Sequence, residues 1–126
     1  MPKRFLSFGA ANAGLAVGCG AFGAHGLKAV LSADMLAVWQ TGVTYQMWHA
    51  LGLILVSLLL QSAPNAKLLH WAGWLMLAGM VLFSGSLYGL ALTQLKALGI
   101  ITPLGGICFL AAWSLVTLFS LTKHQP

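Results

Sequence analysis

Four long apolar segments constrain this chain more than any other feature of its sequence. They cover residues 5–24, 43–60, 69–92 and 103–121, and short polar or turn-forming stretches separate them. A helix of about 20 apolar residues spans a bilayer, so each segment is long enough to cross a membrane. Charged residues make up only 6% of the chain, against about 25% in a soluble domain. The sequence therefore predicts an all-α integral membrane protein with four transmembrane helices in a single domain, residues 1–126.

The first apolar segment is expected to stay in the protein as a membrane span. Lys3 and Arg4 precede it, and residues 11–13 have the small-x-small form of a signal-peptide cleavage site. Apolar character continues to Ala24, however, which favours a retained span. Asn12 lies near the middle of this span, and we expect it to face a protein partner because lipid cannot hydrogen-bond an amide.

Two of the segments carry small residues at four-residue spacing. The first has Ala10, Gly14 and Gly18, and the third has Gly85 and Gly89. Small residues let helix backbones approach closely in lipid, where the hydrophobic effect between helices is weak. We therefore expect these positions to pack against helices. The first span is expected to lie inside the bundle or at an oligomer interface.

The stretch between the first two spans, residues 29–42, has the features of a helix near the membrane surface. Ser32 is a suitable N-cap, and apolar residues follow it at helical spacing. We expect a short amphipathic helix at the interface or an extension of the second span, with a bend at Gly42. Asn65 and Thr102 are the expected N-caps of the third and fourth spans.

The basic residues predict an orientation, because lysine and arginine in short loops favour the cytoplasmic side. One side carries Lys3, Arg4, Lys67 and Lys123, and the other carries Lys28 and Lys96. We expect a multi-pass protein of the bacterial inner membrane with both termini in the cytoplasm. The net charge of +5 comes from scattered residues, which disfavours a nucleic-acid surface because such a surface requires clustering.

Polar residues within the spans gather on the side opposite the termini, in the outer half of the predicted bundle. They are His25, Tyr45, Gln46, His49, Ser84, Ser86, Tyr88 and Thr102. Tyr45 and His49 share a helix face because they are four residues apart. Ionisable groups inside spans usually face the bundle interior or a cavity. These residues therefore form either a ligand site or a set of hydrogen bonds that ties the four helices together.

The same residues allow two more specific interpretations, a cofactor site and a transport function. His25 and His49 come from different spans and are expected at similar depth, as a pair of axial haem ligands or a quinone site would require. A small transporter or channel is a further alternative, although no internal repeat is present. The cysteines, Cys19 and Cys108, fit neither a disulfide framework nor a metal pattern. We expect no metal and no bound cofactor.

Four motifs resemble those of one known family. They read GAFGAHGLK at residues 20–28, YQMWHAL at 45–51, FSGSLY at 83–88 and ITPLGG at 101–106. In this order they are similar to motifs of the YgdD-like proteins, which are small inner-membrane proteins classed as a domain of unknown function, with eukaryotic transmembrane relatives. The resemblance covers essentially the whole chain and implies four spans, and it supplies no activity. Gln94 stands where many members of that family carry glycine.

The function that these features favour is binding rather than catalysis. The first span has more small surface than a lone four-helix bundle needs, so we expect a non-enzymatic bundle. Its partner would be membrane lipid, a second copy in a homo-oligomer, or a larger membrane complex. The alternatives are the small haem- or quinone-binding protein that uses His25 and His49, and the transporter or channel.

Overall fold

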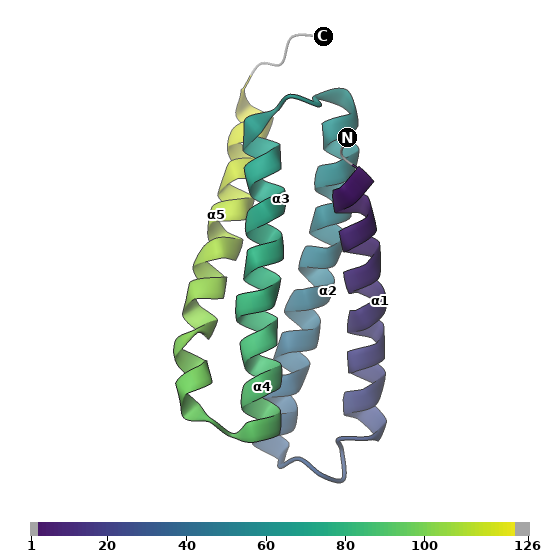
Figure 1. The fold of residues 1–126 in the computed structure, drawn as a ribbon, viewed down its shortest axis with the longest axis vertical. Helices are drawn as coiled ribbons and strands as arrows, with labels where there is room; N and C mark the ends of the chain where they lie inside the picture. The colour runs from purple at the N-terminus through teal and green to yellow at the C-terminus, as the bar shows by residue number, and fades with distance from the viewer. Residues whose placement is uncertain (1–2, 123–126) are drawn as a thin grey trace.

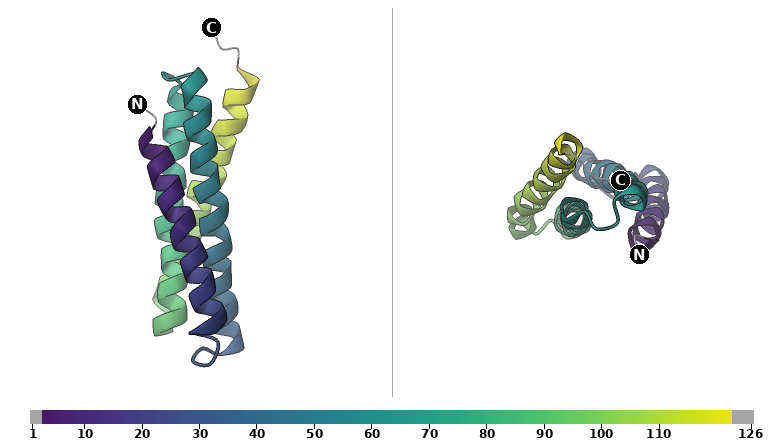
Figure 2. Two further views of the ribbon diagram at one scale, coloured as in Figure 1. Left: turned by 90° about the vertical axis from the view of Figure 1, so that its right-hand side faces the viewer. Right: turned by 90° about the horizontal axis from the view of Figure 1, so that it is seen from above.

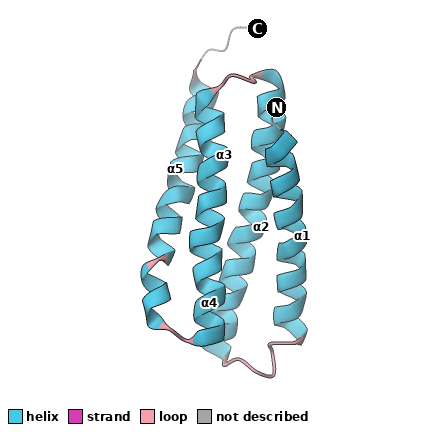
Figure 3. Ribbon diagram, viewed as in Figure 1, coloured by secondary structure: helices cyan, strands magenta, loops and turns pink. Residues whose placement is uncertain are grey.

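The computed structural model describes residues 3–122, and within this range the long elements are all helices (Figure 1). They are α1 (Lys3–His25), α2 (Ala33–Ser62), α3 (Lys67–Gly79), a π-helical segment (Met80–Ser84), α4 (Gly85–Thr93), a 3-10 segment (Lys96–Ile100) and α5 (Thr102–Leu121). The π-helical segment joins α3 to α4 without a break, so these elements form one rod (Figure 3). Lys123 is one of the basic residues on which the predicted orientation rests, and it lies outside the described residues.

Four helical rods in the described residues are long and apolar enough to cross a membrane. They are Lys3–His25, Ala33–Ser62, Lys67–Thr93 and Lys96–Leu121. The rods alternate in direction, with the start of α1, the α2–α3 turn and the end of α5 at one end of the molecule (Figure 1). The predicted all-α membrane fold with four spanning helices is confirmed.

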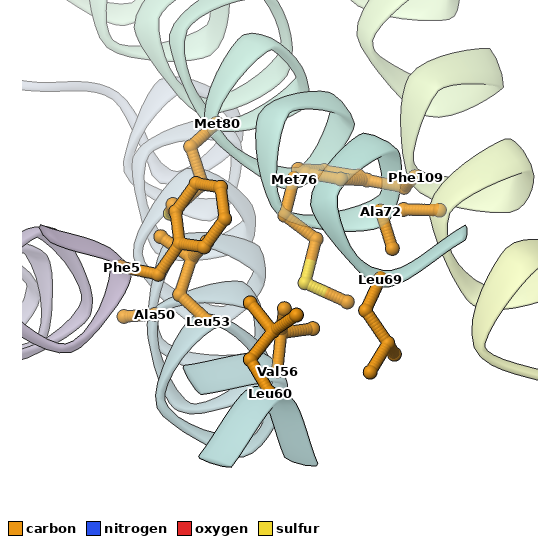
Figure 4. Close-up of a cluster of buried hydrophobic side chains, with 11 residues drawn as sticks. Phe5, Ala50, Leu53, Val56, Leu60, Leu69, Ala72, Met76, Met80 and Phe109 are labelled. Atoms are coloured by element: carbon orange, nitrogen blue, oxygen red, sulfur yellow. The ribbon is translucent and has the colours of Figure 1, made fainter. Parts of the chain in front are cut away.

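The core lies between α2, α3 and α5, and Phe5 from α1 joins it near one end (Figure 4). Its buried side chains are mostly leucine, methionine and alanine, which pack without leaving polar atoms to satisfy. Two glycines of α3 make room for aromatic rings. A Cβ at Gly73 would lie 2.6 Å from the Phe5 ring, and one at Gly79 would lie 2.4 Å from the Phe109 ring. Glycine at these positions therefore lets the helices approach closely.

The helices at the two edges of the bundle are much less buried than the two in the middle. Seen along the helix axes, α1 and α5 lie on opposite sides of the pair formed by α2 and α3 (Figure 2). Only 17% of the most apolar window is buried in the rods of α1 and α5, against 44% in α2 and 39% in the α3–α4 rod. The helix α1 packs mainly on α2 and leaves most of its surface facing outward. The first span is therefore peripheral and does not lie inside the bundle.

The helix α2 begins ten residues earlier than the second apolar segment and runs through Gly42 without interruption. The stretch before residue 43 is thus an extension of the second span, and the expected bend at Gly42 is wrong. Gly42 is instead buried against α4, where a Cβ would lie 2.8 Å from the Tyr88 ring. Ser32 is the N-cap of α2, as predicted, and accepts a hydrogen bond from the Met35 amide at 3.2 Å.

Two other predicted caps are displaced by one residue. The N-cap position of α3 is Ala66 rather than Asn65, and it makes no side-chain hydrogen bond. The N-cap position of α5 is Ile101 rather than Thr102, because a 3-10 turn runs directly into that helix. Gln94 ends α4 in a left-handed conformation with φ of 59°. Glycine adopts this conformation at little cost, so glycine would be favoured at this position.

Candidate functional site

Gln46 is the centre of a hydrogen-bonded network that joins three spans. Its Oε1 accepts a hydrogen bond from the Tyr88 hydroxyl at 2.6 Å, and its Nε2 donates to Asn12 Oδ1 at 3.1 Å. Asn12 Nδ2 in turn donates to the Phe8 carbonyl at 2.9 Å. Gln46 is buried, so these bonds replace those that water would supply outside a membrane. The expectation that Asn12 faces a protein partner is confirmed.

A tryptophan from α2 supports the Tyr88 side of this network. The rings of Trp39 and Tyr88 lie 4.5 Å apart between centroids. Trp39 Nε1 donates to the Cys19 carbonyl of α1 at 2.8 Å. A Cβ at Gly23 would meet the Trp39 ring at 2.7 Å, so glycine there allows α1 to lie against the indole. Trp39 therefore connects α1 to α4 at a position about two helical turns before Gln46 on α2.

Hydroxyl groups tie the remaining helices together. The Ser84 hydroxyl, in the π-helical segment, donates to the Gly42 carbonyl of α2 at 2.7 Å. The Ser86 and Thr102 hydroxyls share a hydrogen bond between α4 and α5. Together with the Gln46 network, these contacts connect all four spans. Of the eight polar residues that the sequence placed in one cluster, five thus take part in these small contacts between helices. Tyr45 and His49 lie apart from them, and His25 takes part in none of them.

His49 has both of its ring nitrogens occupied by neighbours in the bundle. Trp113 Nε1 donates to His49 Nε2 at 2.9 Å, so Nε2 acts as the acceptor. Nδ1 lies 2.7 Å from the Tyr45 carbonyl and must be the protonated nitrogen, since a carbonyl can only accept. The ring stacks on Phe109 with 3.5 Å between centroids and is only 3% exposed. This arrangement holds a neutral imidazole in one tautomer.

His25 lies far from His49. It is the last residue of α1 and is exposed, close to the level of Trp39, whose ring contacts Gly23. His49 follows Trp39 by ten positions along α2, which corresponds to about 15 Å. The prediction that the two histidines share a depth is therefore wrong, and with it the haem or quinone site built from this pair. The error arose because the second helix begins before its apolar segment.

Two hollows open between the helices on either side of the π-helical segment. The larger, which we call the α2–α5 groove, has a volume of about 480 Å³. It is lined by Tyr45, Trp48, His49, Phe83, Pro103, Gly106, Ile107, Phe109, Leu110 and Trp113. The smaller has a volume of about 300 Å³ and is lined by Asn12, Gln46, Leu77, Met80, Val81, Ser84, Gly85 and Tyr88. π-helical segments often occur at functional sites, and here one contributes to both hollows.

The five positions predicted to pack helices together differ in where they lie. Ala10, Gly14 and Gly18 are exposed, and a Cβ at Gly14 or Gly18 would meet no described atom within 4 Å. Gly85 is exposed in the same way. Only Gly89 faces a close neighbour, with Leu98 2.9 Å from the position of a Cβ. Within one chain, therefore, the small-residue ladder of α1 faces outward rather than toward α2.

Cys19 and Cys108 are free thiols, and residues 3–122 contain no group of three histidine, cysteine or acidic side chains that could hold a metal ion.

Sequence reasoning missed the aromatic residues that α5 contributes to the α2–α5 groove. Phe109 and Trp113 are four residues apart and so share one face of α5. That spacing could have marked them as a pair. Their contact with His49, however, depends on the register of α5 against α2, which no local pattern specifies.

Comparison with known proteins identifies relatives along nearly the whole chain. The family model described as a protein of unknown function (DUF423) matches residues 19–106. The UPF0382 membrane protein YwdK of Bacillus subtilis is 54% identical over 114 residues, which cover 90% of this chain and 93% of that protein. A UPF0382 membrane protein of Staphylococcus epidermidis is 49% identical over 119 residues, covering 94% and 96%.

No solved structure matches the chain. The family model spans most of the helical bundle and includes the motifs that carried the resemblance. The relatives are themselves named membrane proteins, in agreement with the four spanning helices. The chain therefore belongs to the DUF423 family of integral membrane proteins, a family whose function is unknown.

Proposed function

We propose that this protein is a non-enzymatic component of the bacterial inner membrane that acts by associating with a second copy of itself through the outward face of α1. The observation that carries this proposal is the position of α1 at the edge of the bundle. Its most apolar window is only 17% buried, and Gly14 and Gly18 face outward with open space beside them.

The chemistry of the spans supports binding rather than catalysis. Gln46, Asn12 and Tyr88 satisfy one another, and His49 has both nitrogens engaged. A general acid or base needs a free position within reach of its substrate. Groups that already hydrogen-bond each other instead hold helices together, as interhelical polar contacts do in lipid. The outer surface of the bundle is therefore the part that is free to bind a partner.

The outward face of α1 has the features of a helix-docking surface in lipid. Ala10, Gly14 and Gly18 follow one another at four-residue spacing and are exposed. Larger exposed side chains, Leu15 and Val17, flank the glycines. Two such faces can approach closely and fit flanking side chains beside the glycines of the partner, which is how small-residue motifs associate. A second copy fits because the same ladder on both partners is self-complementary.

Replacing Gly14 and Gly18 together with leucine tests this proposal. Both positions have room for a side chain within one chain, so the fold of the monomer should persist. We expect the dimer fraction in nanodiscs or detergent, measured by light scattering or single-molecule photobleaching, to fall at least about tenfold, because small-residue contacts are sensitive to added bulk.

Gly85→Leu is the matched control, since Gly85 is an exposed glycine on α4 that also has open space beside it. It should leave the dimer fraction unchanged. A wild-type protein that is strictly monomeric would refute self-association, and loss of the dimer in the Gly85 variant alone would move the interface away from α1. Lipid or an unrelated membrane protein would then be the partner to examine.

We also propose that both termini lie in the cytoplasm. Lys3, Arg4 and Lys67 lie at the same end of the bundle, and Lys28 and Lys96 lie at the other (Figure 1). This distribution agrees with the preference of short basic loops for the cytoplasmic side. A C-terminal fusion should therefore be active with a cytoplasmic reporter, and activity only with a periplasmic or extracellular reporter would reverse the orientation.

A further inference from the structure

The α2–α5 groove lies close to the middle of the membrane-spanning part of the protein. Tyr45, Phe83 and Phe109 are in mutual ring contact there, with centroid separations of 4.6 to 6.2 Å. Counted along its own span, each of the three lies within about 5 Å of the midpoint. The groove is therefore set deep in the bilayer, where a hydrogen-bonding group finds no water.

Two hydrogen-bond donors that line this groove have no partner among the described residues. The Tyr45 hydroxyl and Trp48 Nε1 make no hydrogen bond to residues 3–122, although the two rings lie 4.9 Å apart. The Tyr45 hydroxyl is not sealed inside the protein, because no buried side-chain nitrogen or oxygen in the partly or fully buried described residues lacks a partner. Trp48 is 55% exposed. Both donors are therefore accessible to a molecule in the groove.

The other polar side chains of the groove behave differently. His49 and Trp113 bond to each other, and His49 also bonds to the Tyr45 carbonyl. Elsewhere in the spans, Tyr88 is bonded to Gln46. An unmet donor at this depth costs free energy unless a ligand supplies an acceptor. The pair Tyr45 and Trp48 thus marks a place for a lipid-soluble molecule that carries a hydrogen-bond acceptor.

The depth of the groove selects among such molecules. The ester carbonyls of phospholipids lie near the edge of the hydrocarbon core, about 15 Å from its midplane. A molecule with a carbonyl on an apolar ring can place that carbonyl deeper. The walls suit a flat ring, since Tyr45, His49 and Phe109 are nearly parallel, with interplanar angles of 10° to 15°. Aromatic rings favour stacked or edge contacts with another flat π-system.

We propose that the α2–α5 groove binds the carbonyl-bearing ring of an isoprenoid quinone, with Tyr45 and Trp48 as hydrogen-bond donors to one carbonyl. The volume of about 480 Å³ falls in the range of small-molecule sites, roughly 300–1,000 Å³. The exposed side chains of Ile107 and Leu110 provide an apolar surface for the isoprenoid tail. This site lies on α2 and α5 and is independent of the association proposed for α1.

The test is the retention of a short-chain ubiquinone by the full-length protein in phosphatidylcholine nanodiscs, with empty nanodiscs as the baseline. The wild type should bind it saturably, about one molecule per chain. Tyr45→Phe should weaken binding about tenfold, the effect of losing one hydrogen bond in an apolar site. Tyr88→Phe is the matched control, because it removes a hydroxyl that is already bonded to Gln46, and it should bind like the wild type.

Gly106→Leu gives a second, independent test. Gly106 lines the groove, and a Cβ there would meet no described atom within 4 Å, so leucine should fill the groove without disturbing the helices. We expect this variant to lose binding. The proposal is overturned if wild-type nanodiscs retain no more quinone than empty ones, or if Tyr45→Phe or Gly106→Leu binds as tightly as the wild type. It is also overturned if a phospholipid displaces the quinone in a Tyr45-dependent manner, since the groove would then hold acyl lipid.

Discussion

Replacing Gln46 with leucine tests whether the polar network holds the spans together. Leucine is close to glutamine in volume, so the packing around α2 changes little. The substitution removes the hydrogen bonds to Tyr88 and Asn12, which join α2 to α4 and α1. The perturbation is therefore confined to two polar contacts between helices.

The expected cost follows from those two contacts. Hydrogen bonds between membrane helices contribute about 0.6 kcal/mol each on average and up to about 1.7 kcal/mol. Two of them contribute about 1–3 kcal/mol, and the half-buried Tyr88 hydroxyl also loses its acceptor. We expect Gln46→Leu to lower the free energy of unfolding by about 2–3 kcal/mol.

Equilibrium unfolding in mixed micelles with increasing denaturing detergent measures this change. The control is Tyr88→Phe, which removes the Tyr88–Gln46 bond and leaves the Gln46–Asn12 bond in place, and it should cost about 1 kcal/mol. The destabilisation of the double variant should be smaller than the sum of the two single destabilisations by about 1 kcal/mol, because both single variants remove the same Tyr88–Gln46 bond. A change below about 0.5 kcal/mol for Gln46→Leu, or strict additivity in the cycle, would refute the network as a structural element.

Two further substitutions test the packing of α5. Gly105→Ala should destabilise the protein by about 1–3 kcal/mol, because the added Cβ would clash with the backbone nitrogen of Phe83. Gly106→Ala has open space around the added Cβ and should be neutral or slightly stabilising. Equal thermal stability of the two variants in detergent would contradict this prediction. Trp113→Phe should cost about 1 kcal/mol because it leaves His49 Nε2 without its donor. A wild-type unfolding curve for that variant would show that the contact contributes nothing.

Much of the fold could be predicted because membrane spans obey a local rule. A run of about 20 apolar residues must form a helix in lipid, since every backbone group has to be satisfied within the segment. Ser32 was predicted correctly as an N-cap for a similar reason, because its side chain needs only an amide three residues away. The start of α2 was missed because hydropathy locates the most apolar part of a helix and does not register the less apolar turns at its end.

The candidate site was predictable only in its composition. The polar residues that matter were visible in the sequence, yet their grouping into one cluster was not correct. Gln46 pairs with Asn12 and Tyr88, while His49, on the adjacent face of α2, pairs with Trp113. Residues 46 and 49 are three apart, so the helix periodicity alone left them on neighbouring faces. Their separation depends on which helices stand on each side of α2.

The sequence by itself determined that this chain crosses a membrane with four helices, because apolar length and the need for internal hydrogen bonds allow few other structures. Tertiary structure alone decided that α1 lies at the edge with its glycines outward, and that His25 is remote from His49. It also decided that Tyr45 and Trp48 line a groove with unmet donors. These features depend on the order and register of helices against one another. Lipid is as apolar as the side chains, so hydropathy does not specify which face of a span meets a helix and which meets lipid.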